Sequence, residues 1–178
     1  MRELLAEGAV AASRVLASAS QPQTEALGEA LAPLLAANDV LVLSGDLGAG
    51  KTQLTKGIAR GLGVAEPVTS PTFNLLLAHE GSPPLNHFDL YRLDSAEQLE
   101  DLDYWGTLES GGGSVGEGGD RFPDAMPADG LVVRITITGD ESRELALTPL
   151  GERGRELAAA WVGAALDAAP GVAPKAAP

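Results

Sequence analysis

The segment VLVLSGDLGAGKTQL, residues 40–54, constrains the possible folds of this chain more than any other stretch. An apolar run over residues 40–43 gives way to three glycines, a lysine and a threonine within a few positions. An ordinary loop has no need of so much backbone freedom beside a single cation. The segment matches the Walker A pattern G-x-x-x-x-G-K-[ST], whose fixed positions are here Gly45, Gly50, Lys51 and Thr52.

The residues on both sides of these glycines predict a strand–loop–helix unit. VLVLS, residues 40–44, is typical of a buried strand in a parallel sheet. QLTKGIARGLG, residues 53–63, predicts a helix that ends at Gly63. Glycines at 45, 48 and 50 allow successive backbone N–H groups to point inward, and the N-terminus of the following helix completes a nest for an anion.

The polar side chains of the motif suit a polyphosphate. Lys51 supplies a mobile positive charge for the β- and γ-phosphates, and the Thr52 hydroxyl can ligate Mg²⁺. The sequence therefore predicts a nucleotide-binding site between this strand and this helix. Hydrolysis needs two further groups, an acid that organises the metal or its waters and a residue that positions the attacking water.

Composition excludes several other classes of protein. With 25 Asp and Glu against 12 Lys and Arg, the formal charge is -13, so the chain repels nucleic-acid backbones and is a poor binder of them on its own. The absence of cysteine rules out disulfides and thiolate zinc sites. No apolar run approaches the roughly 18 residues that a membrane span needs, and Glu3, Glu7 and Arg14 interrupt the alanine-rich start. We expect a cytoplasmic protein without membrane association.

The rest of the chain alternates strand and helix patterns, which favours an α/β fold. The first 20 residues are typical of a helix or a short strand. Helical spacing of leucines predicts a helix over 24–37 with Thr24 as its N-cap. Beyond the Walker A unit we expect extended chain at 68–80, a strand at 84–93, a short acidic helix after Ser95, a β-hairpin of 131–138 with 143–149, a helix at 152–168 and a disordered tail at 169–178.

Several residues are candidates for the remaining chemistry. Asp89 comes late in a predicted strand, where a carboxylate would emerge beside the phosphate-binding loop; a turn-facing Asp without a role is the alternative. Thr72 and its neighbours in VTSPTF fit a switch-like loop or a plain Ser-Pro turn. His79 and His87 are interpreted as structural. The acidic run from Asp94 to Glu109 is interpreted as a solvated helix face, with a docking surface for a basic partner as the alternative.

Three signatures in this order resemble the TsaE family, also called YjeE. They are SGDLGAGKTQLTKGIARGLG, then VTSPTF, then HFDLYRL followed by an acidic helix, and the resemblance runs from about Thr24 to Leu157. It implies a P-loop NTPase-like fold, a mostly parallel sheet flanked by helices with added antiparallel strands. It also implies binding and hydrolysis of ATP with Mg²⁺, docking on the TsaB–TsaD complex, and a role in threonylcarbamoyladenosine modification in which tRNA is contacted only indirectly.

The same resemblance assigns roles to individual positions. Lys51 would contact the β- and γ-phosphates, and Thr52 would bind Mg²⁺. Asp89 would organise Mg²⁺ or the attacking water, and Thr72 would belong to the switch-like loop. Thr24 would lie near the base and sugar, and Arg143 would approach the nucleotide. The residues that would wrap the phosphates are Gly48, Ala49, Gly50, Lys51, Thr52 and Gln53.

One stretch departs from the family pattern. The family has an apolar strand ending in Val-Glu-Trp, whose Glu is the second acidic ligand, followed by Gly-Glu-Gly. This chain has ESGGGSVGEGGDRF, with glycine at six of the nine positions 111–119, and the simplest alignment pairs residues 116–118 with Gly-Glu-Gly. We expect this strand end to be deleted and Glu117 to substitute for the missing ligand from a glycine-rich loop, which would hold it poorly. Our hypothesis is that ATP binds but turns over slowly.

Two other functions remain open from the sequence. A nucleotide-dependent binding module with little turnover fits the missing Glu-Trp pair. A small-molecule kinase would use the same loop but needs an arginine-rich lid, which the sequence does not show. We expect an N-terminal extension at 1–20, a P-loop ATPase domain at 21–168 and a disordered tail at 169–178.

Overall fold

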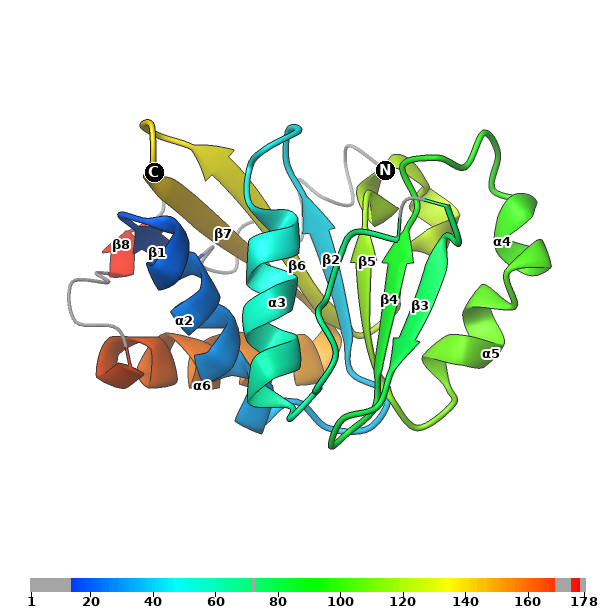
Figure 1. The fold of residues 1–178 in the computed structure, drawn as a ribbon, viewed down its shortest axis with the longest axis horizontal. Helices are drawn as coiled ribbons and strands as arrows, with labels where there is room; N and C mark the ends of the chain where they lie inside the picture. The colour runs from blue at the N-terminus through cyan, green and yellow to red at the C-terminus, as the bar shows by residue number, and fades with distance from the viewer. Residues whose placement is uncertain (1–13, 72, 169–173, 177–178) are drawn as a thin grey trace.

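The computed structural model describes residues 14–71, 73–168 and 174–176, and its centre is an eight-stranded sheet with the order β3-β4-β5-β2-β6-β7-β1-β8 (Figure 1). The strands are β1 Arg14–Ser18, β2 Val40–Ser44, β3 Leu76–His79, β4 Leu85–Asp89, β5 Gly113–Glu117, β6 Gly130–Ile137, β7 Arg143–Leu150 and β8 Pro174–Ala176. The α-helices are α2 Gln21–Leu31, α3 Lys51–Gly61, α4 Gln98–Asp101, α5 Tyr104–Leu108 and α6 Gly151–Ala168, and short 3-10 turns lie at Ala32–Leu34, Gly119–Arg121 and Pro123–Ala125.

The middle of the sheet is parallel and its edges are antiparallel. β4, β5, β2 and β6 run in the same direction, whereas β3 is antiparallel to β4, and β7, β1 and β8 continue from β6 in antiparallel pairs. This arrangement confirms the predicted α/β class, with a parallel core and added antiparallel strands. The edge pairs include β1, inside the predicted N-terminal extension, and β8, inside the tail predicted to be disordered, so that prediction is wrong for these three residues.

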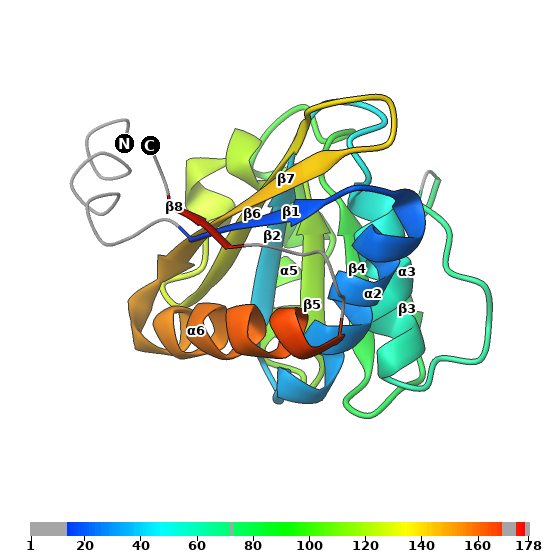
Figure 2. The same ribbon diagram turned by 90° about the vertical axis from the view of Figure 1, so that its left-hand side faces the viewer.

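Helices cover both faces of the sheet (Figures 1 and 2). One core lies between the sheet and α2, α3 and α6, and it contains the buried Leu27, Ile58 and Trp161. The indole Nε1 of Trp161 donates to the carbonyl oxygen of Leu27 at 2.9 Å, which fastens α6 to α2. The opposite face is closed by the segment around α4 and α5, with Phe88 and Tyr104 in a second core. None of the helices among the described residues is both long and apolar enough to cross a bilayer.

α2 begins earlier than predicted. Ser20, not Thr24, is its N-cap, because the Ser20 side chain accepts from the backbone N–H of Gln23 at 3.3 Å. Thr24 is instead a buried residue within the first turns, and its hydroxyl lies 2.8 Å from that of Ser18. α2 also lies very close to α3, since a Cβ added at Gly57 would be 2.0 Å from the carbonyl oxygen of Glu25.

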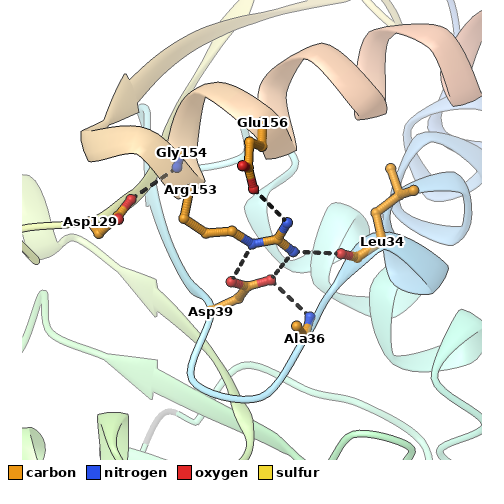
Figure 3. Close-up of polar contacts among 7 residues, drawn as sticks. All are labelled: Leu34, Ala36, Asp39, Asp129, Arg153, Gly154 and Glu156. Atoms are coloured by element: carbon orange, nitrogen blue, oxygen red, sulfur yellow. Dashed lines mark hydrogen bonds and ion pairs between the residues drawn. The ribbon is translucent and has the colours of Figure 1, made fainter.

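An ion pair joins α6 to the start of β2 (Figure 3). Arg153 donates from Nε and Nη2 to the two carboxylate oxygens of Asp39 at 2.9 and 2.7 Å, and from Nη2 to the carbonyl of Leu34 at 2.8 Å. Asp39 also accepts from the backbone N–H of Ala36 at 2.8 Å. Asp39 thereby fixes the entry into β2, and the hydrogen bonds raise the pKa of Arg153 above its ordinary value.

The central strand that we expected to be missing is present. β5, with the sequence GSVGE, is buried along its length and pairs in parallel with β2 on one side and β4 on the other. Val115 is its single apolar side chain of any size, and the neighbouring Leu90 occupies the space beside Gly116. The strand is therefore specified by backbone pairing on both sides, which residue preferences along the chain do not reveal.

Candidate functional site

The loop between β2 and α3 has the geometry that the Walker A motif requires. In Figure 1 it stands at the upper edge of the sheet, where the parallel strands end. Gly48 and Gly50 have φ of 79° and 108°, in the left-handed region that favours glycine, and Gly50 directly precedes the first residue of α3. Residues of this turn and of the helix N-terminus line one cleft, as an anion site demands.

Lys51 is held inside this loop. Its Nζ donates to the carbonyl oxygens of Gly45 at 2.8 Å and Asp46 at 3.0 Å, and only 8% of the residue is exposed. Tyr91 covers it, with Nζ 5.0 Å from the ring centroid and the phenol donating to the Gly45 carbonyl at 3.0 Å. Burial, followed by the negative charges of Asp120 and Glu117, raises the pKa of the Tyr91 phenol above its ordinary value.

Two carboxylates lie beside this loop at the ends of neighbouring strands. Asp89 ends β4 and Glu117 ends β5, and the two are paired in register. Oε1 of Glu117 lies 3.5 Å from the hydroxyl of Thr52, the residue after Lys51, and 2.9 Å from Nε2 of His87. Oδ1 of Asp89 accepts from the backbone N–H of Tyr91 at 3.0 Å. Glu117 is thus held in a buried strand, contrary to the loop that we expected.

A cleft of about 930 Å³ brings most of the predicted residues together. Its lining includes residues from the loop, from both carboxylate-bearing strands, from α2 and from the β6–β7 turn. Of the predicted site residues, those in the lining are Thr24, Gly48, Gly50, Lys51, Thr52, Gln53, Asp89, Glu117 and Arg143. Ala49 is fully buried behind them, Ser70 of the switch-like segment lines the cleft, and Thr72 lies outside the described residues.

Arg143 lines the cleft and supports the loop through its backbone. Its Nε donates to the carbonyl of Ala49 at 2.9 Å and its Nη2 to that of Gly48 at 3.3 Å, while Nη1 binds carbonyls of the β6–β7 turn, Gly139 among them. The guanidinium therefore cross-links two segments that are about 90 residues apart in sequence. In this structure its bonds go to the loop backbone.

Tyr91, Arg92 and His87 are among the residues of the site that sequence reasoning missed. Tyr91 and Arg92 line the cleft and follow Asp89 within three positions. Their place in the signature HFDLYRL could therefore have predicted that they belong to the site. His87 was interpreted as structural, yet it contacts Glu117. A pattern along one strand cannot show this contact, because Glu117 comes from a different strand.

The oxygen ligands present suit Mg²⁺ in company with phosphates. Across the part of the chain that the structure describes, no group of three or more His, Cys, Asp or Glu could hold a metal on its own. The Thr52 hydroxyl, Glu117 and Asp89 instead form a sparse set of hard oxygen donors, and Mg²⁺ typically takes one or two carboxylates together with substrate phosphates and water. The residues fit a metal that arrives with a nucleotide.

Comparisons with known proteins agree with this geometry. The model of the family "Threonylcarbamoyl adenosine biosynthesis protein TsaE" matches residues 18–145. A protein of Streptomyces coelicolor named tRNA threonylcarbamoyladenosine biosynthesis protein TsaE is 45% identical over 135 residues, 71% of this chain and 90% of that protein. The protein of the same name from Bacillus subtilis is 37% identical, covering 74% and 82%. The crystal structure of Bacillus subtilis YdiB has a TM-score of 0.72 at 29% identity, covering 85% of this chain and 96% of that one.

Proposed function

This chain belongs to the TsaE family of threonylcarbamoyladenosine biosynthesis, and from that premise we propose that it binds ATP with Mg²⁺ and hydrolyses it in the service of a TsaB–TsaD complex. The single observation that carries the proposal is the convergence of Lys51, Thr52, Asp89 and Glu117 on one cleft. We propose a cytoplasmic protein that contacts tRNA only indirectly, because its charge of -13 repels nucleic acid.

Binding would rest on the loop and on Lys51. The loop residues Gly48 to Gln53 would wrap the phosphates. Lys51, already directed across the loop by two carbonyls, would need little reordering to reach the β- and γ-phosphates. Arg143 would keep the loop in shape. Thr24 and the β6–β7 turn line the same cleft and would lie toward the sugar and base.

Hydrolysis would rest on the two carboxylates. The attacking water forms a bond to the γ-phosphorus while the bond from that phosphorus to the bridging oxygen of the β-phosphate breaks, which gives ADP and phosphate. Mg²⁺ would supply charge neutralisation for the phosphate oxygens, with Thr52 as the ligand from the chain. Glu117 would hold the metal's waters, and Asp89, with Oδ1 fixed by the N–H of Tyr91, would orient the attacking water.

A binding module with little turnover is the second candidate. The observation that favours it is the absence of a Glu-Trp pair, since Gly118 directly follows Glu117. Glu117 ends a buried strand, so its carboxylate is not carried on the flexible loop that would have favoured slow turnover. Phosphate release with TsaB and TsaD present separates the two candidates: steady release supports the ATPase, and release at the background rate supports the binding module.

Calorimetric titration with ATP and Mg²⁺ tests the binding step. We expect saturable binding by the wild type and a loss of at least about tenfold in affinity for Lys51→Ala, since a charge-assisted contact to phosphate contributes about 1.5–3 kcal/mol. Lys56→Ala, on the same helix but outside the cleft lining, should bind as the wild type does. Absence of binding by the wild type, or equal binding by both variants, would overturn the proposal.

A further inference from the structure

His87 is a fully buried polar residue that the mechanism above leaves without a role. It lies in β4 two residues before Asp89, pairs with Val115 of β5, and has 0% exposure. Its Nε2 lies 2.9 Å from Oε1 of Glu117. Its other ring nitrogen, Nδ1, is buried and has no hydrogen-bond partner among the described residues.

The hydrogen bond fixes a carboxylate that has little other support. Glu117 stands between Gly116 and Gly118, which have no side chains to pack against it. Apart from His87, the contact made by its carboxylate within the described chain is the 3.5 Å approach of Thr52. Since a Glu side chain loses rotamer entropy when it is ordered, a single strong hydrogen bond decides where this carboxylate points.

The direction of this bond follows from the two groups. An ionised carboxylate only accepts, so Nε2 of His87 carries the proton and donates it. Nδ1 is then an acceptor without a proton. In the opposite tautomer Nδ1 would carry a buried N–H that has no acceptor, and the lone pair of Nε2 would face the Glu117 carboxylate. Both considerations select the same tautomer. The ring of His79 lies 6.4 Å away between centroids, on β3, which flanks β4 on the side opposite β5. Its Nδ1 is hydrogen-bonded to Glu66, not to Glu117.

We propose that His87 is a positioning residue for the metal site: through Nε2 it holds Glu117 against Thr52, where a nucleotide-bound Mg²⁺ would lie. This inference rests on the proposed function and adds to it a residue that does not itself touch nucleotide or metal. It places the support of the metal site within the sheet, across β4 and β5. Outer-shell hydrogen bonds of this kind are commonly worth tenfold or more in metal affinity.

The test compares His87→Leu with His87→Gln in the full chain. The Gln side-chain amide can donate from the position of Nε2, and Leu cannot donate. Calorimetric titrations with ATP in the presence of Mg²⁺, and with ATP in EDTA, give the gain in affinity due to metal. We expect His87→Leu to reduce this gain by about tenfold and His87→Gln to restore most of it, with equal metal-free affinity throughout. His79→Gln is the control and should keep the wild-type gain.

Long-range ¹⁵N NMR of the unliganded wild type adds a readout that is independent of nucleotide and of variant folding. We expect the proton of His87 on Nε2. Three outcomes would each overturn the inference. They are an Nε2 without a proton, a metal-dependent gain in affinity that His87→Leu leaves unchanged, and a folded His87→Gln variant whose gain is as low as that of His87→Leu. If His87→Leu does not fold, the Gln variant and the NMR signal decide. Failure of the wild type to bind ATP at all would instead overturn the proposed function.

Discussion

A Cβ atom added to Gly118 would lie 2.9 Å from the ring of Tyr91, so the aromatic ring that covers Lys51 rests directly on a glycine. Gly118 directly follows Glu117, and its φ of 79° is in the left-handed region. The guanidinium of Arg121 also donates to the carbonyl of Tyr91. Tyr91 is thus held from two sides, by its packing on Gly118 and by the hydrogen bond from Arg121.

The first prediction concerns this contact. Gly118→Ala should lower the free energy of unfolding by about 2 kcal/mol, because a residue with a Cβ is strained at this φ and the new methyl group would collide with the Tyr91 ring. For a chain of this size the melting temperature should fall by about 4–8 °C. Gly163→Ala, in an open position of α6, is the matched control and should leave the melting temperature equal or raise it. Equal melting by Gly118→Ala and the wild type would contradict this packing.

The second prediction concerns the support of the phosphate-binding loop. Arg143→Ala removes the bonds to the carbonyls of Ala49 and Gly48, so the loop should become less ordered and ATP should bind about tenfold more weakly. Arg134→Ala is the control, since Arg134 is mostly exposed and its nearest acidic partner, Asp120, is 4.0 Å away. Titration calorimetry of both variants measures the effect. An affinity of Arg143→Ala equal to that of Arg134→Ala would remove Arg143 from the site.

The third prediction concerns the ion pair in Figure 3. Asp39→Ala leaves the guanidinium of Arg153 and the N–H of Ala36 without their acceptor, and should lower the free energy of unfolding by about 2–3 kcal/mol. Glu156→Gln alters a second, exposed partner of Arg153 at 3.5 Å and should change stability by less than about 0.5 kcal/mol. Urea unfolding followed by circular dichroism compares them; similar midpoints would show that the Asp39 pair is not stabilising.

The fourth prediction concerns stability in alkali. Burial raises the pKa of Tyr104 to about 12 from its ordinary value of 10.0, and its hydroxyl donates to the carbonyl of Ala125. Above pH 10 the unfolded chain loses this proton while the folded chain keeps it, so stability should fall by about 1.4 kcal/mol per pH unit until pH 12. Below pH 10 this contribution is fully present.

Tyr104→Phe isolates that contribution, because it removes the titrating group and leaves the ring. Urea unfolding between pH 9 and about pH 11 should show a steeper loss for the wild type than for the variant. Parallel pH profiles for the two proteins would contradict a buried phenol. Tyr91→Phe serves as a second comparison, since the pKa of Tyr91 is also raised, first by burial and then by Asp120 and Glu117.

The phosphate-binding unit and the closing hairpin could be predicted from the sequence because their patterns are local. The run VLVLS became β2, the glycines became the loop, and Lys51 became the first residue of α3, each a consequence of residues within a few positions. The alternating segments around Gly139 became β6 and β7 for the same reason. Such elements can be predicted from the spacing of hydrophobic residues and the positions of glycines, and both are visible within a single segment of sequence.

Tertiary structure alone decided β5 and the groups that meet at its end. A glycine-rich GSVGE is a poor strand by preference, yet two neighbouring strands supply backbone partners on both sides and Leu90 fills the space beside it. The placing of Glu117 beside His87 and Thr52, and of Tyr91 over Lys51, likewise depends on strand order and register. Such contacts join residues dozens of positions apart, so they follow from backbone pairing and packing across the sheet. The chemistry of the Walker A loop, by contrast, was already determined by fifteen consecutive residues, 40–54.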